Sequence, residues 1–184
     1  MLIARSMQEA HLYMDLHACD CGAEEFEREH RLEDRDGAMV AVYEGMCPQC
    51  GRTRSFEFRM SEELPPAPPA FGGFEPSRII DPGEFMWVGD RASTDSGLRL
   101  LNTPTAEHRE IRPRTEYAIA AFEEVAKFLP ERGDRIPEAL FTSRRGRELY
   151  TKDPERFTRE EIAAALELKR SILADIDRFS PPRS

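Results

Sequence analysis

Four cysteines in two close pairs are the residues of this chain best suited to chemistry. Cys19 and Cys21 stand in "CDCG", and Cys47 and Cys50 stand in "CPQCG". Thiolate sulfur is a preferred ligand of zinc, which takes four ligands in a tetrahedron. The glycine after each pair allows the left-handed turn that aims backbone amides at the sulfurs. The spacing therefore predicts a closed structural Zn2+ site, in which His17 is a competing ligand candidate.

Other uses of paired cysteines fit this sequence less well. A redox Cys-x-x-Cys motif usually opens a helix in a βαβ unit, whereas strands are expected beside "CPQCG". Disulfides need an oxidising compartment. We expect a cytoplasmic protein with no membrane partner, because "MLIARSMQEA" is too short and polar for a signal peptide and no apolar run approaches the roughly 20 residues of a membrane span. A four-thiolate shell leaves no position for water, so catalytic zinc is not expected.

Three strands are expected to carry the cysteine loops. "FEREHRLE" and "AMVAVYEGM" flank the turn signal "DRDG" and predict a hairpin. "TRSFEFRM" places Phe56, Phe58 and Met60 on one face of a third strand. With these strands, "CPQCG" resembles the knuckle of the zinc-ribbon superfamily over about residues 15–60, although "CDCG" is one residue shorter than the usual knuckle. The resemblance implies a three-stranded antiparallel zinc ribbon.

The chain divides into three regions. Residues 1–60 are expected to form a short helix, started at Met7 by the capping box "SMQE", and then the ribbon. Residues 61–77 are rich in proline and glycine and predict a linker or strap. Part of that strap should pack, because a free linker does not need the two phenylalanines of "AFGGF". Residues 78–184 are expected to form an α-helical domain, so the predicted fold is α+β, with the ribbon packed on the helical domain.

Helix signals follow one another in the third region. Asp81 as N-cap, Pro82 at the first helical position and Glu84 in the first turn predict a helix that runs through "FMWVGDRA". The clearest amphipathic segment is "RTEYAIAAFEEVAKFLPERG". "SRRGRELYTKD" predicts a shorter helix, and a capping box of Thr158 and Glu161 starts the last one. The role of the segment Arg78–Ser93 is not predicted.

The charge balance bears on the kind of partner. The 184 residues carry a net charge of −9, which disfavours nucleic acid as a partner of the whole surface and favours basic proteins. Trp87, the only tryptophan, fits either a helix buried on two sides or an exposed anchor for a partner. The expected partner contacts are Glu24, Glu25, Glu27, Glu33, Asp34, Asp36 and Trp87.

The sequence contains no G-x-S-x-G, no glycine-rich phosphate loop and no H-E-x-x-H. We therefore expect a non-enzymatic zinc-binding interaction module, such as an immunity or inhibitor protein that acts on a basic, nuclease-like partner. One alternative is a nucleic-acid-binding or transcription-associated factor. A second is an enzyme whose site is assembled from Asp90, Arg91 and His108. The nucleic-acid alternative would use Arg52, Arg54, Arg144, Arg145 and Arg147.

Overall fold

The chain forms two compact units, and the computed structural model describes residues 1–180 of it. One unit consists of Met1–Pro66 and Phe71–Ile79, and the other of Ala67–Ala70 and the chain from Ile80 onward. The prediction of an α+β fold is confirmed. The last four residues of the predicted helical domain, 181–184, lie outside the described part. The packing of the ribbon on that domain stays a prediction.

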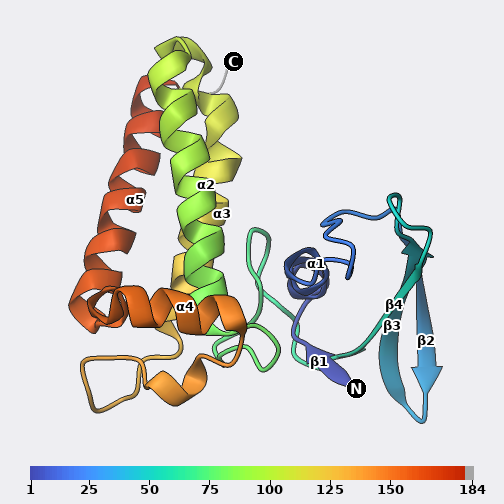
Figure 1. Ribbon diagram of the computed structural model, residues 1–184. Coiled ribbons are helices and arrows are strands. Elements are labelled where there is room, and N and C mark those ends of the chain that lie inside the picture. Colours follow the sequence, from blue (N-terminus) through green and yellow to red (C-terminus); the bar gives the residue numbers. More distant parts are fainter. Residues whose placement is uncertain (181–184) are drawn as a thin grey trace. The chain divides into compact units, whose positions relative to one another are not determined.

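The first unit contains a four-stranded sheet with the order β1-β4-β3-β2 (Figure 1). The strands are β1 (Leu2–Ala4), β2 (Glu29–Arg35), β3 (Ala38–Met46) and β4 (Thr53–Met60). The last three are antiparallel, as predicted, but β1 joins β4 in parallel. The sheet therefore has one strand more than the three predicted from the sequence, and it is mixed and not purely antiparallel. Three residues are too short for a periodic pattern, and β1 forms because β4 offers it hydrogen-bonding partners.

The hairpin of β2 and β3 turns at Asp36 and Gly37. Both have positive φ angles, 55° and 78°, as a type I′ turn requires. The strand β2 begins at Glu29, later than the predicted start at Phe26. The preceding segment instead crosses the end of β3, where a Cβ on Gly45 would lie 1.9 Å from the carbonyl oxygen of Glu27.

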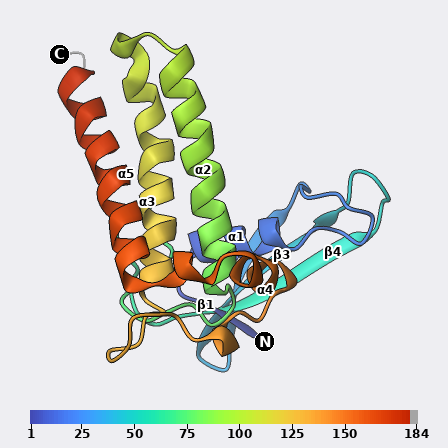
Figure 2. The same ribbon diagram turned by 60° about the vertical axis from the view of Figure 1, so that its left-hand side comes forward.

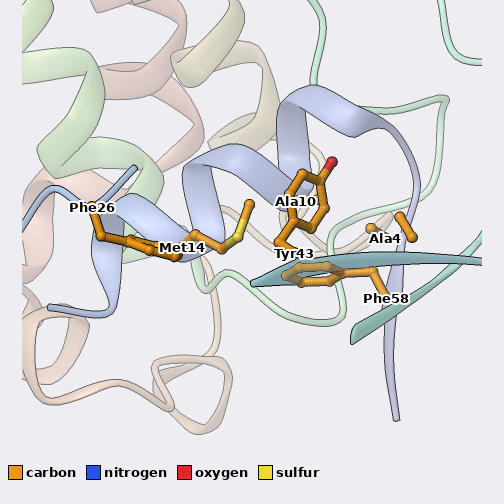
Figure 3. Packing of buried hydrophobic residues seen from close by; sticks show 7 residues of the cluster. Ala4, Ala10, Met14, Phe26, Tyr43 and Phe58 are labelled. Carbon is orange, nitrogen blue, oxygen red and sulfur yellow. The ribbon is translucent and has the colours of Figure 1, made fainter. Parts of the chain in front are cut away.

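The helix α1 (Met7–Leu16) packs on the sheet. Figure 3 shows Ala10 and Met14 of this helix beside Tyr43 and Phe58 of the sheet, in one buried apolar cluster. Ser6 caps the helix by accepting a hydrogen bond from the amide of Glu9. The carboxylate of Glu9 is fully buried and accepts hydrogen bonds from the backbone amide and the side chain of Arg5. These bonds take the place of the bond to the amide of Ser6 that the predicted capping box would make.

Between β4 and α2 the described chain has neither helix nor strand. Phe71 is fully buried, and the hydroxyl of Ser6 donates to its carbonyl at 2.7 Å. The other phenylalanine of "AFGGF", Phe74, is 94% exposed. The predicted strap therefore packs through one of its two phenylalanines.

The second unit is built on three long helices that lie side by side in both views (Figures 1 and 2). They are α2 (Pro82–Asn102), α3 (Arg112–Ala126) and α5 (Arg159–Phe179). The shorter helix α4 (Arg144–Lys152) runs crosswise at the start of α2 (Figure 1). Short 3-10 helices lie between them: η1 (Thr105–Ile111), η2 (Glu138–Leu140) and η3 (Pro154–Phe157).

The start of α2, which lies in the segment Arg78–Ser93, is tied to the start of α4. Asp81 caps α2 by accepting from the amide of Glu84 at 2.9 Å, as predicted, and also accepts from the amide of Ser143, the N-cap of α4, at 2.6 Å. Burial raises the pKa of Glu84. The two helices meet at glycine, because a Cβ on Gly83 would lie 2.4 Å from the Cα of Gly146.

Candidate metal centre

The loop between β3 and β4 carries the second cysteine pair. The amide of Gly51 donates to the carbonyl of Cys47 at 2.9 Å, and the amide of Cys47 donates to the carbonyl of Arg52 at 2.9 Å. Gly51 has a φ of 68°, which a residue with a Cβ adopts only at a cost. The tight turn presents Cys47 and Cys50 from one short loop.

The first pair lies in a similar turn after α1. The amide of Gly22 donates to the carbonyl of Cys19 at 2.7 Å, and the amide of Cys19 donates to the carbonyl of Ala23 at 2.8 Å. Gly22 has a φ of 94°. This turn spans four residues, from Cys19 to Gly22, whereas the turn of the second pair spans five, from Cys47 to Gly51. The short spacing of "CDCG" is thus compatible with a knuckle of the same general kind.

The four sulfurs come together between the two loops. All of them lie within 4.8 Å of one another. The Sγ atoms of Cys19 and Cys50 are 3.7 Å apart, and those of Cys21 and Cys47 are 3.5 Å apart. Four sulfurs bound to one zinc ion at about 2.3 Å would be about 3.8 Å apart, whereas a disulfide needs about 2.05 Å. The cysteines are free, and their spacing suits a metal ion such as zinc.

The thiols are also poised electrostatically for a cation. The backbone amide of Cys50, together with that of Gln49, lowers the pKa of Cys47 to about 6. The backbone amide of Ala23 favours a thiolate at Cys21, but the surrounding thiols, led by Cys47, and burial raise the pKa of Cys21 to about 12. Cys47 therefore ionises readily, and Cys21 resists ionisation beside it. A divalent cation would remove that resistance, because metal ligands lose their protons on binding.

Arg54 connects the elements that carry the two loops. It is 7% exposed, and its guanidinium carbon lies 4.1 Å from the centre of the Phe26 ring. It donates to the carbonyl of His17, at the end of α1, and at 3.5 Å to the carbonyl of Glu24. From the sequence alone, this arginine was a candidate only for the nucleic-acid alternative. The alternation of "TRSFEFRM" could have revealed its place, because Arg54 shares the face of Phe56.

The residues nearest the cysteines have partners of their own. The Nδ1 atom of His17 is 2.7 Å from the carbonyl oxygen of Tyr13, and the two rings stack at 3.9 Å. His17 is not in the group of potential ligands in the described chain. Arg52, from the second loop, pairs with Asp20 of the first. This ion pair joins the two loops outside the sulfur cluster.

The acidic residues expected to contact a partner fall into two groups in the first unit. The strand β3, whose nine residues span about 25 Å, separates the metal loops from the hairpin turn. At the turn end, Glu33 pairs with Arg31 and Arg35, which lower its pKa. The group beside the loops consists of Glu24, Glu25 and Glu27, and the group at or near the turn consists of Glu33, Asp34 and Asp36.

An open groove lies beside the metal loops. It has a volume of about 1100 Å³ and is lined by residues 25–29 and 44–48, with Gly51 and Thr53. Among the residues that the structure describes, the carboxylates of Glu25, Glu27 and Glu29 have no cation within ion-pair distance. Met46, which lines the same groove, is 68% exposed. The groove thus combines unpaired negative charge with an apolar side chain.

Trp87 lies in the second unit, half-buried on α2. The guanidinium carbons of Arg145 and Arg91 are 3.8 Å and 4.6 Å from its ring centres. Trp87 is therefore neither fully buried on two sides of the helix nor a freely exposed anchor, which were the two alternatives predicted from the sequence. The signal for one contact was present in the sequence, since Trp87 and Arg91 are four residues apart on a predicted helix.

The other arginines of the predicted basic patch are engaged locally. Arg144 pairs with Glu148 at 2.7 Å, and Arg147 donates to the carbonyl of Thr142.

The three residues suggested for an enzyme site also have separate partners. The carboxylate of Asp90 accepts hydrogen bonds from both terminal nitrogens of Arg156, at 2.8 and 3.0 Å. The Nε2 atom of His108 lies 2.9 Å from the carbonyl oxygen of Thr103. Arg91 lies against Trp87.

Comparison with protein-family models, with curated proteins and with solved structures finds no match to this chain. Within residues 1–180, no helix has both the length and the apolar character needed to cross a membrane.

Proposed function

We propose that this chain is a non-catalytic protein-interaction module, held together by structural zinc, that receives a basic segment of a partner protein in the groove beside the metal loops. An immunity or inhibitor protein acting on a basic, nuclease-like target would have this design. The observation that carries the proposal is the groove, in which Glu25, Glu27 and Glu29 have no cationic partner in the described chain.

Zinc has a structural task at this end of the first unit. The buried residues that meet at the two loops are Cys19, Ala23 and Cys47, which form a very small apolar cluster. Such a cluster supplies little hydrophobic stabilisation. A metal that binds only the folded loops adds its binding free energy to their stability. The zinc would therefore fix the groove wall formed by residues 44–48, which includes Cys47 itself.

The charge of the groove favours a basic occupant. Lysine and arginine side chains would pair with the exposed carboxylates of Glu25, Glu27 and Glu29, and an apolar residue of the partner would cover Met46. Electrostatic attraction to the overall acidic chain would also speed the encounter.

A capture experiment with two matched variants tests the proposal. The zinc-loaded chain is used as bait in native cell extract, with and without nuclease treatment. We expect one basic protein to be recovered in both samples. Replacing Glu25, Glu27 and Glu29 by glutamine should abolish the recovery, because it removes the unpaired charge of the groove.

The control variant is Asp34→Asn with Asp36→Asn, which removes charge at the far end of the hairpin and should leave the recovery unchanged. Equal recovery by the groove variant would contradict the assignment of the groove. Recovery only in samples without nuclease would instead mean that nucleic acid carries the interaction, as in the alternative function.

A further inference from the structure

Trp87 and two arginines form a cationic cluster on the second unit. Trp87 and Arg91 lie one turn apart on α2, and Arg145 reaches the same indole from α4. Arg91 is exposed, while Trp87 and Arg145 are half-buried. We call these three residues the tryptophan clasp.

The positive charge of the clasp is not neutralised by its surroundings. In the part of the chain that the structure describes, neither Arg91 nor Arg145 has a carboxylate within ion-pair distance. Two acidic residues near these arginines in the sequence form ion pairs with other arginines: Glu148 pairs with Arg144, and Asp90 pairs with Arg156.

Glu84 is the acidic group that acts electrostatically on Arg145. It is only 6% exposed and serves the cap of α2 through a hydrogen bond with Asp81. Burial raises its pKa, and no ion pair joins its carboxylate to Arg145 in the described chain. The clasp is therefore a site of positive charge on a chain whose net charge is −9.

Two guanidinium groups on one indole are each attracted to the ring and repelled by each other. An oxyanion that reaches either group would relieve the repulsion and accept paired hydrogen bonds from its planar N–H groups. The indole holds both groups in place, so less side-chain entropy is lost when the anion binds. The supporting helices are themselves joined through Asp81, which accepts from the amides of Glu84 and Ser143.

We propose that the tryptophan clasp binds carboxylate side chains of an acidic protein segment. Two unpaired arginines match one or two carboxylates, whereas a nucleic-acid strand needs a series of cations along its backbone. Both guanidiniums lie against the indole, so the ring is less available for stacking on bases. This site lies in a different unit from the metal loops and does not depend on the function proposed for the groove.

The experiment uses Trp87 as the reporter, because it is the only tryptophan of the chain. The zinc-loaded chain of 184 residues is titrated with a fluorescently labelled hexaglutamate peptide at low salt. We expect a saturable change in tryptophan emission and a matching rise in the anisotropy of the label, and both should weaken as salt is added. Competition with inorganic phosphate tests whether a free oxyanion occupies the same site.

Variants then locate the binding site by anisotropy. Arg91→Gln and Arg145→Gln should each weaken binding at least tenfold, because each removes one of the two cations. Arg144→Gln is the matched control: it lies beside Arg145 but is paired with Glu148, and should change the affinity less than twofold. Circular dichroism spectra like that of the unmodified chain would show that all three variants fold.

The proposal would be overturned by the absence of saturable binding, by an equal loss of affinity in Arg144→Gln, or by tighter binding of an oligothymidylate of equal charge than of hexaglutamate. The last result would assign the clasp to nucleic acid. Displacement of the peptide by phosphate at concentrations comparable to the peptide's own dissociation constant would also count against a site for protein carboxylates.

Discussion

Single glycines decide whether the cysteine loops can close. Gly22 and Gly51 follow the two cysteine pairs, and both have φ angles in the left-handed region. A Cβ at either position would meet nothing within 4 Å, so the requirement for glycine there comes from the backbone angle and not from crowding. The amide of each glycine closes its turn on the first cysteine of the pair.

At this scale we predict that Gly51→Ala destabilises the zinc-loaded first unit by about 1–2 kcal/mol, the cost of a left-handed backbone for a residue with a Cβ. Gly51→Asn is the matched control and should cost clearly less, because asparagine tolerates this region. Urea denaturation of both variants measures the difference. Identical stability of Gly51→Ala and the unmodified chain would contradict the left-handed turn.

The elements of the second unit depend on a close helix crossing. α2 begins with a complete capping box and a proline at its first position, both readable from the sequence. The sequence did not reveal that Gly83 meets Gly146 of α4, because no local pattern connects residues more than sixty positions apart. The crossing brings the first turn of α2 against α4 and sets Arg145 beside Trp87.

For these elements we predict opposite effects of the same substitution at two positions of α2. Gly83→Ala should destabilise the second unit by about 1–3 kcal/mol, because its Cβ would collide with backbone atoms that cannot turn aside. Gly97→Ala should stabilise it by up to about 1 kcal/mol, since open space surrounds that position and alanine favours helix. Thermal unfolding followed by circular dichroism compares the two. The crossing would be refuted by a Gly83→Ala variant that melts at or above the unmodified temperature.

The whole molecule consists of two units with separate sources of stability. The first has a modest apolar cluster between α1 and the sheet, and a cysteine group at the end of the hairpin. The second contains four of the five α-helices found within residues 1–180. Removal of the metal should therefore destabilise the first unit and leave the stability of the second unchanged.

At the scale of the molecule we predict that a strong zinc chelator lowers the melting temperature of the first unit only. Circular dichroism at 222 nm should retain most of its helical signal, while a probe in the first unit, such as hydrogen exchange of the β3 amides, should lose protection. Chelator already loaded with zinc is the control and should have no effect. Loss of the helical signal together with the sheet would show that the metal stabilises both units.

Local sequence patterns predicted many of the turns and helix caps of this protein, because the interactions behind them join residues that are close in the sequence. The D-G turn, the caps at Ser6, Asp81 and Thr158 and the pairing of cysteines rest on residues within a few positions of one another. The α+β class and the three long strands follow from such signals. They failed for β1, whose three residues carry too little pattern. They place Arg54 on the face of Phe56 but do not reveal its contact with Phe26 from another segment.

By itself, then, the sequence determined the helix starts, the hairpin and the two cysteine loops, because turn and cap energetics are local. Only the tertiary structure decided that four sulfurs lie within 4.8 Å of one another. It also divided the predicted acidic contacts between the two ends of a hairpin and placed two arginines on Trp87. These outcomes depend on strand register and helix crossing, which bring distant residues together through packing that no short segment encodes alone.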